Sequence, residues 1–221
     1  KGSINVLDFT KRMEDNGAAL IAVHGRTRAQ LYSGVADWDM ITKVKNQLSV
    51  PVIANGDIIS GEAAVKCLKR TGADGVMIGR SVFGDPWIFE EVAYALRGEE
   101  YPGRPVLKDR IGVAVRQFEL SEQDHGEKIA CLEARKHFAW YLKGVRNASF
   151  YKREISSLTT MADIYRVAKE VIRDLEYLQQ MYPAEAKKYQ KIIVSILDRL
   201  DYEGSMIYDE YPDRFLLQKH G

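Results

Sequence analysis

Three stretches decide the fold: AVHGRTRAQLYSG at 22–34, PVIANGDI at 51–58 and GVMIGRSVFGDPWIF at 75–89. Each contains a short apolar run that stops at a polar cluster, and helical patterns separate the runs. Continuous apolar strands that alternate with helices are typical of a parallel sheet covered by helices. The polar clusters would then converge at the carboxyl ends of the strands, where (β/α) barrels bind their ligands. We therefore predict the last three β/α units of a TIM (β/α)8 barrel.

The spacing of apolar residues also predicts the individual elements. Ser60 is a suitable N-cap, and Gly17 and Gly72 are suitable helix ends. The predicted helices lie at 5–16, 38–48 and 63–70, and the predicted strands lie at 18–23, 52–54 and 75–78.

The pattern changes after Arg97, where RGEEYPGRP has the composition of a linker. Beyond it we find no strands, only helical spacing at 109–120, 128–143, 161–181 and 184–200. Four antiparallel helices joined by short loops indicate a small bundle. The expected fold class is thus α/β plus all-α. The domains are a partial barrel at 1–98, a linker at 99–105, a helical domain at 106–200 and an unassigned tail at 201–221.

Composition excludes some classes of function. The 221 residues are 46% hydrophobic and 29% charged with a net charge of +1, so any attraction to nucleic acid must be local. No stretch approaches the roughly 20 apolar residues of a membrane span, and we find no signal peptide at the start. Cys67 and Cys131 match no metal or disulfide spacing, so we expect no metal, buried inert thiols and a cytoplasmic protein.

Asn55-Gly56-Asp57 has two interpretations. Asn-Gly favours the type I′ turn of a hairpin, but the flanks here are a buried strand and a helix. We prefer a ligand site in which Gly56 lets backbone N–H groups approach an anion and Asn55 offers a donor and an acceptor to a heterocycle.

Gly79-Arg80 and His24 end the other two strands. A single arginine is commonly a surface residue and a lone histidine is commonly structural. We nevertheless prefer a ligand contact at both positions, because both residues lie at the predicted ligand-binding end of the barrel. A glycine amide and the guanidinium of an arginine suit a phosphate. His24 is followed closely by Arg26 and Arg28, which suggests an anionic ligand.

Five stretches in this order resemble the flavin-dependent tRNA-dihydrouridine synthases, especially the bacterial B-type branch. They are VHGRTR at 23–28, YSGVADW at 32–38, VIANGDI at 52–58, MIGR at 77–80 and DPWIF at 85–89, and ARKHFAWYLKG at 134–144 resembles the family's C-terminal helical domain. The resemblance implies an eight-stranded FMN-binding barrel followed by a helical domain that grips tRNA. It also implies hydride transfer from reduced FMN to the C5–C6 double bond of uracil, with NADPH as the reductant. By the same comparison the FMN contacts would be His24, Asn55, Gly56, Asp57, Gly79 and Arg80.

The sequence departs from the family in one respect. The family's catalytic cysteine lies in an Asn-x-Gly-Cys-Pro stretch on an earlier strand, and this sequence contains no such stretch. No catalytic residue is therefore assigned. We expect a fragment that lacks five barrel strands and is inactive alone.

Basic and aromatic residues are interleaved between 130 and 154, where few acidic residues oppose them. An ordinary solvated helix face is the simpler interpretation, but one-sided charge in a neutral chain favours phosphate contacts. The expected RNA contacts are Arg26, Arg28, Arg135, Lys136, Lys143, Arg146, Lys152 and Arg153. Two alternatives stay open: an RNA-binding remnant without catalysis, and a phosphate-binding barrel enzyme of another class.

Overall fold

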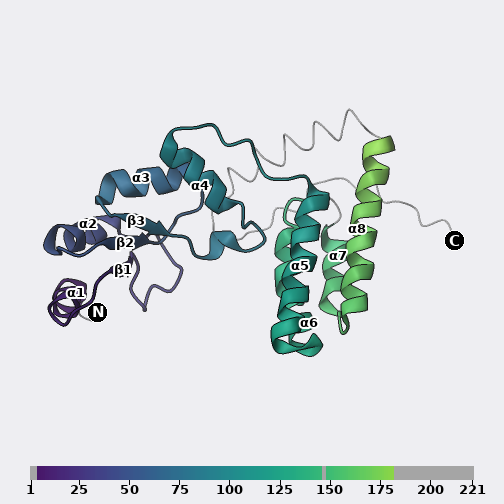
Figure 1. Ribbon diagram of the computed structural model, residues 1–221, viewed down its shortest axis with the longest axis horizontal. Coiled ribbons are helices and arrows are strands. Elements are labelled where there is room, and N and C mark those ends of the chain that lie inside the picture. The colour runs from purple at the N-terminus through teal and green to yellow at the C-terminus, as the bar shows by residue number, and fades with distance from the viewer. Residues whose placement is uncertain (1–3, 146–147, 182–221) are drawn as a thin grey trace. The chain divides into compact units, whose positions relative to one another are not determined.

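The computed structural model describes residues 4–145 and 148–181, which contain three strands and eight α-helices (Figure 1). The chain divides into a unit of residues 1–172 and a unit of residues 173–221, and only the end of the last helix is described in the second unit. The elements are α1 (Val6–Asp15), β1 (Ile21–His24), α2 (Trp38–Gln47), β2 (Val52–Asn55), α3 (Gly61–Thr71), β3 (Gly75–Met77), the 3₁₀ turn η1 (Arg80–Val82), α4 (Ile88–Arg97), α5 (Leu107–His125), α6 (Glu127–Tyr141), α7 (Ala148–Ser156) and α8 (Met161–Met181).

The three strands form one parallel sheet in the order β1-β2-β3. Ile21 pairs with Val52 and His24 with Asn55, while Asn55 also pairs with Met77. The predicted alternation of parallel strands and helices is confirmed. The register places the last residues of all three strands at the same edge of the sheet.

Local sequence explains where the helices begin and end. The Ser60 hydroxyl accepts a hydrogen bond from the Ala63 amide at 3.1 Å, and Gly72 ends α3 with a left-handed φ of +66°. The Asp37 carboxylate caps α2 in the same way through the Met40 amide at 2.9 Å. The roles predicted for Ser60 and Gly72 are confirmed, and α3 starts two residues earlier than predicted.

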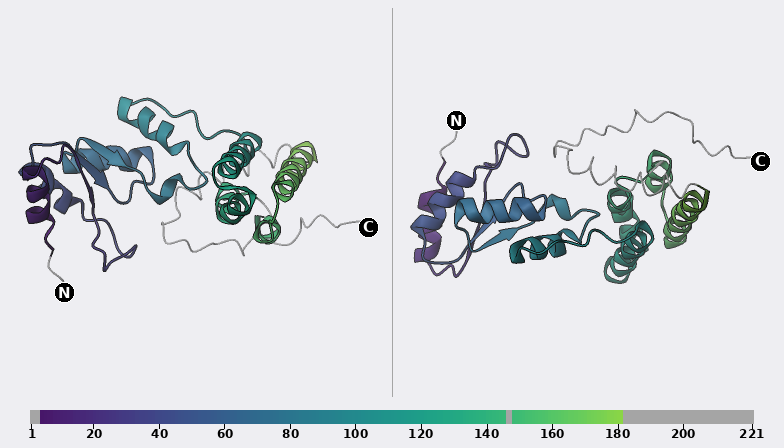
Figure 2. Two further views of the ribbon diagram at one scale, coloured as in Figure 1. Left: turned by 60° about the horizontal axis from the view of Figure 1, so that its bottom comes forward. Right: turned by 90° about the horizontal axis from the view of Figure 1, so that it is seen from above.

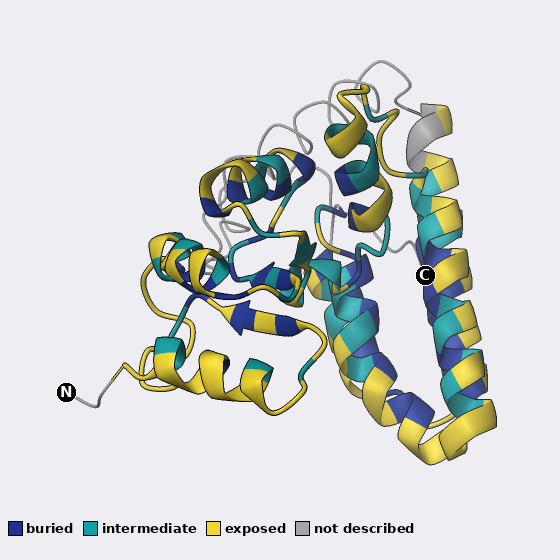
Figure 3. Cartoon of the chain, turned by 60° about the vertical axis from the view of Figure 1, so that its left-hand side comes forward, coloured by how far each residue is buried: buried dark blue, intermediate teal, exposed yellow. Residues whose placement is uncertain are grey.

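The core of the sheet region lies between the strands and helices α2–α4. Val52 and Ala54 of β2 are fully buried against Ile41 and Val44 of α2 and Ala64 of α3. Helix α1 is mostly exposed but packs Val6 and Leu7 against the core, and β1 alternates between buried and exposed residues (Figure 3). Burial is therefore concentrated at β2 and the helices that follow it.

The helical region differs in part from the prediction. α5, α6 and α8 lie where helices were expected, and α5 lies beside α6 in both further views (Figure 2). α7 was not predicted as a helix, although Ala148, Tyr151 and Ile155 bury one face of it at helical spacing. The predicted helix at 184–200 and the tail at 201–221 lie outside the described residues. Within the described residues, no helix is long and apolar enough to cross a membrane.

The segment after β3 is joined to α6 and to the linker by specific contacts. Phe83 stacks on Trp140 with ring centroids 4.4 Å apart and planes inclined by 8°. Arg104 of the linker donates to both carboxylate oxygens of Asp85, to Oδ1 at 3.1 Å and to Oδ2 at 2.7 Å, and pairs with Glu91 of α4 at 2.6 Å. The segment that carries the predicted phosphate site is thus held from two sides.

Gly84 provides a test of this packing. Its φ is +70°, and a Cβ there would overlap the carbonyl carbon of Trp140, whereas Gly98 has a φ of +72° with nothing within 4 Å. Gly98→Ala should lower the free energy of unfolding by about 1 kcal/mol through backbone strain alone. Gly84→Ala should lower it by about 2–4 kcal/mol because overpacking adds to the strain. Equal losses in urea denaturation of the two variants would contradict the packing of Gly84 against α6.

Candidate functional site at the strand ends

The carboxyl ends of β1 and β2 bring two predicted site residues side by side. His24 and Asn55 are paired in the sheet, and the ladder continues one step further as the Gly25 amide donates to the Asn55 carbonyl at 2.9 Å. Asn55 is half-buried, and its side-chain amide makes no hydrogen bond to the residues that the structure describes. An amide in this position can give both a donor and an acceptor to a bound ring.

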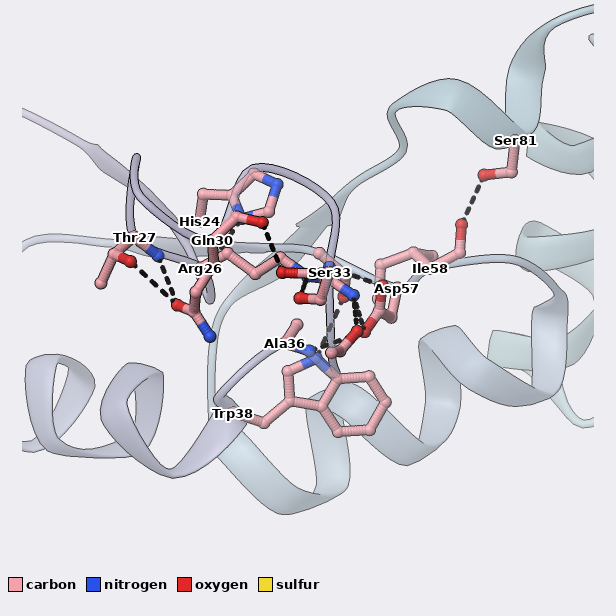
Figure 4. A network of polar contacts seen from close by, with 12 residues as sticks. His24, Arg26, Thr27, Gln30, Ser33, Ala36, Trp38, Asp57, Ile58 and Ser81 are labelled. Atoms are coloured by element: carbon pink, nitrogen blue, oxygen red, sulfur yellow. Dashed lines mark hydrogen bonds and ion pairs between the residues drawn. The ribbon is translucent and has the colours of Figure 1, made fainter. Parts of the chain in front are cut away.

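Arg26 and Asp57, each two residues beyond a strand end, form an ion pair (Figure 4). The guanidinium donates to the two carboxylate oxygens of Asp57 at 2.7 and 3.0 Å, and also to the carbonyls of Ser33 and Gly34 at 3.2 and 2.5 Å. The Asp57 carboxylate additionally accepts the Ala36 amide at 2.7 Å. The Arg26 side chain is only 5% exposed and that of Asp57 is 23% exposed, so Arg26 is buried and Asp57 is partly buried.

This arrangement bears on two expectations. Arg26 was expected to contact RNA and Asp57 was expected to contact FMN, but their polar atoms are already used by each other and by the backbone. We therefore leave Arg26 out of the RNA surface proposed below and assign Asp57 a structural role. Sequence reasoning missed the pairing because 31 residues separate the partners.

The loop at 26–36 is closed onto the sheet edge by close packing as well as by charge. A Cβ on Gly56 would lie 2.8 Å from the Ala36 Cβ, and one on Gly25 would lie 3.0 Å from the same atom. Gly56 has a φ of +120°, and its carbonyl accepts the Trp38 indole N–H at 3.0 Å. The glycine at 56 is thus explained by the approach of Ala36, a reason that the sequence interpretation did not identify.

His24 has a defined hydrogen bond on one side of its ring. Its Nδ1 accepts the backbone N–H of Arg26 at 3.1 Å. Partial desolvation of the mostly exposed ring lowers the pKa of His24, and the charges of Arg26 and Arg80 lower it further, against the opposing effect of Asp57. The imidazole is therefore neutral at pH 7.

The third predicted group, Gly79-Arg80, follows β3. The space that a Cβ on Gly79 would occupy has no atom within 4 Å, so a ligand can approach this backbone. The Arg80 guanidinium lies 3.6 Å from the centre of the Tyr32 ring, which brings the loop at 26–36 next to it. Ser81 donates to the Ile58 carbonyl at 2.5 Å and joins the segments that follow β3 and β2.

The basic residues of α6 and α7 fall into two groups. Arg135 is half-buried and donates twice to the Leu158 carbonyl, at 3.0 and 2.8 Å, so its guanidinium supports the turn after α7. Lys136, Lys143 and Arg153 are exposed and Lys152 is half-buried. Arg28 is exposed in the loop after β1, and Arg146 lies outside the described residues.

Both cysteines are buried, Cys67 in α3 and Cys131 in α6, and burial raises the pKa of each thiol. Neither lies near the strand ends in sequence or topology. In the described part of the chain there is no group of three or more His, Cys, Asp or Glu residues that could hold a metal ion.

A parallel β/α sheet whose strand ends carry polar side chains and an accessible glycine defines a class of protein: the β/α proteins, whose barrels place their functional residues at this edge. Comparison with known sequences is more specific. The family model described as dihydrouridine synthase (Dus) matches residues 1–180, and the chain belongs to this family.

Individual relatives agree. The chain is 38% identical over 162 residues to a probable tRNA-dihydrouridine synthase 1 of Synechocystis, covering 73% of this chain and 45% of the relative. It is 37% identical over 152 residues to a probable tRNA-dihydrouridine synthase of Rickettsia conorii, covering 69% and 46%. It is 36% identical over 159 residues to tRNA-dihydrouridine synthase B of Pasteurella multocida, covering 72% and 48%. The matched region thus spans about half the length of these relatives.

The structural role of Arg26 can be tested by a conservative substitution. Lysine keeps the charge but cannot reach two carboxylate oxygens and two carbonyls at once. Arg26→Lys should therefore lower the free energy of unfolding by about 2 kcal/mol, since part of a buried pair is broken. Arg28→Lys, the same change at an exposed position of the same loop, should stay within about 0.5 kcal/mol of the wild type. Urea denaturation followed by circular dichroism measures both, and indistinguishable values would contradict the assignment.

Proposed function

We propose that this chain is the C-terminal part of a flavin-dependent tRNA-dihydrouridine synthase. Its sheet region would form the last three units of an eight-stranded barrel, and the helices from α5 onward would form a helical domain that binds tRNA. The observation that carries the proposal is the convergence of His24, Asn55 and Gly79-Arg80 at one edge of a parallel sheet, in a chain that belongs to this family. Family membership argues against a phosphate-binding enzyme of another class.

The residues at this edge fit FMN. The unbonded Asn55 amide and the ring of His24 suit the polar edge of a flavin, which has carbonyl and ring nitrogen acceptors. The open backbone at Gly79 and the cation of Arg80 suit its phosphate. When bound, FMN would supply the hydride that reduces the C5–C6 bond of uracil, and NADPH would be the source of electrons.

The other expected FMN contacts, Gly56 and Asp57, would act indirectly. Gly56 makes room for Ala36, and Asp57 holds Arg26. Each would therefore shape the flavin site by fixing the loop at 26–36.

Reduction also needs a proton donor at the uracil ring, and geometry decides which group can serve. Cys67 and Cys131 are buried inside helices, so neither is suited to this role. We therefore propose that the chain alone forms no dihydrouridine.

The tRNA surface would include Lys136, Lys143, Lys152 and Arg153, with Arg28 beside the flavin edge and Arg146 outside the described residues. Bringing a uracil to a flavin requires unstacking it, which costs a few kcal/mol. Phosphate contacts by a second domain can offset this cost without reading the base sequence. Such a protein acts on tRNA in the cytoplasm.

FMN affinity tests the proposed flavin site. In a polypeptide of the family's full length that carries these residues, Asn55→Ala and Arg80→Ala should each weaken FMN binding by roughly ten- to a hundred-fold. Hydrogen bonds to charged groups are typically worth about 1.5–3 kcal/mol and neutral ones about 0.5–1.5 kcal/mol, so the loss should be near the lower end for Asn55 and larger for Arg80. The control is Lys69→Ala, an exposed residue of α3, which should leave the affinity unchanged. Titration of the apoprotein by flavin fluorescence gives the constants. Wild-type affinity in both site variants would refute the flavin site.

The salt dependence of tRNA binding tests the second surface. Replacing Lys136 and Lys143 together by glutamine should weaken binding to all tRNAs alike. It should also flatten the slope of log affinity against log salt concentration by about one to two units, because fewer counterions are released. The matched control is Lys66→Gln with Lys69→Gln, an equal loss of charge on the exposed face of α3. If the two double variants behave alike in filter binding, the residues of α6 are only a solvated face.

A further inference from the structure

The ion pair of Arg26 and Asp57 lies beside the strand ends. Arg26 and Asp57 each lie two residues beyond the end of a strand, and their polar atoms are taken up by each other and by the backbone. A partly buried ion pair contributes little stability relative to apolar packing of equal volume, so its presence beside a ligand edge calls for another explanation. The residue whose side chain forms the pair, Arg26, also donates its backbone amide to His24.

That amide fixes the protonation pattern of His24. The Arg26 N–H donates to Nδ1 at 3.1 Å, and only a ring nitrogen with a free lone pair can accept it. In a neutral imidazole the proton must then be on Nε2. No described residue accepts a hydrogen bond from this Nε2, and the His24 side chain is exposed at the strand end.

The surrounding contacts hold the ring and the amide in place. The loop at 26–36 is anchored by the side chain of Arg26 on Asp57, and the Ala36 amide is anchored on the same carboxylate. The Asp37 amide donates to the Gly25 carbonyl at 2.6 Å, and the Gly25 amide donates to Asn55. The Cε1 of His24 lies 3.5 Å from where a Cβ on Gly56 would be, so the His24 ring packs beside the backbone of Gly56.

We propose that Arg26 and Asp57 are positioning residues: by holding the Arg26 amide against Nδ1, they fix His24 as the Nε2–H tautomer. His24 then presents a hydrogen-bond donor to a carbonyl or ring nitrogen acceptor of a bound heterocycle. The identity of that heterocycle as a flavin or a uracil rests on the proposed function, but the tautomer itself does not. The charged groups that face His24 are Arg26, Asp57 and Arg80.

The tautomer can be measured on the chain as it is, without flavin or tRNA. Long-range ¹H–¹⁵N spectra of the histidine-labelled protein at neutral pH distinguish Nδ1–H from Nε2–H rings. The chain has four histidines, and loss of one set of signals in His24→Gln assigns this ring. We expect wild-type His24 to be the Nε2–H form, with a hydrogen-bonded Nδ1. A mixture of tautomers, or the Nδ1–H form, would overturn the proposal outright.

Two variants test the role of the pair. Asp57→Asn and Arg26→Lys should each convert His24 to a mixture of tautomers. The matched control is Asp39→Asn, which removes the same charge from an exposed pair in which Arg70 also donates to both carboxylate oxygens. It should leave the His24 spectrum unchanged. If a folded Asp57→Asn or Arg26→Lys protein retains the single tautomer, the pair does not position His24.

This experiment is separable from the test of the proposed function. A fixed tautomer that depends on Asp57, together with no measurable FMN affinity of the full-length polypeptide, would support the positioning role and refute the flavin site. Normal FMN binding with a mixture of His24 tautomers in the wild type would support the flavin site and refute the positioning role.

Discussion

The bidentate contact between Arg26 and Asp57 is the constraint on which the arrangement of the strand ends depends. Arg26 comes from the loop after β1 and Asp57 from the loop after β2, so the pair joins two segments that the sheet alone leaves unconnected beyond Asn55. Asp57 itself has a φ of +59°, a conformation that costs a non-glycine residue roughly 1 kcal/mol or more. The five hydrogen bonds made by the two side chains offset that cost and close the loop at 26–36. Ala36 can then pack against Gly25 and Gly56, and His24 receives the Arg26 amide.

The exposed pair of Asp39 and Arg70 shows what distinguishes the buried one. It has the same fork geometry, at 2.9 and 2.8 Å, but its side chains are 67% and 53% exposed. Water competes for such a pair, which is worth at most about 1 kcal/mol. At Arg26 the guanidinium also satisfies two loop carbonyls that would otherwise lose their partners. The buried pair therefore specifies a conformation, whereas the exposed pair only connects two helices.

Much of the fold was predictable because the signals are local. Apolar runs, the Ser60 cap and the left-handed Gly72 identify β1–β3 and α3 within two or three residues. The convergence of His24 and Asn55 followed from the parallel sheet. The roles of Arg26 and Asp57 were not predictable from spacing, because their contact joins residues 31 positions apart. In addition, the sequence pattern around an arginine near a strand end is the same whether its side chain faces solvent or the interior. The same applies to Arg135, whose partner is a backbone carbonyl 23 residues away. α7 was not predicted because it is only nine residues long, and three buried positions, Ala148, Tyr151 and Ile155, give too short a pattern to identify a helix.

A double-mutant cycle on the pair tests this account most directly. The free energies of unfolding of Arg26→Met, Asp57→Asn and the double variant, with wild type, give the coupling between the two side chains. We predict a coupling of about 2 kcal/mol, near the upper part of the range for residues in contact, because each single variant leaves a buried partner unsatisfied. The equivalent cycle on Asp39 and Arg70 should give less than about 1 kcal/mol. Additive effects of Arg26 and Asp57, within about 0.3 kcal/mol, would contradict the claim that this pair organises the site.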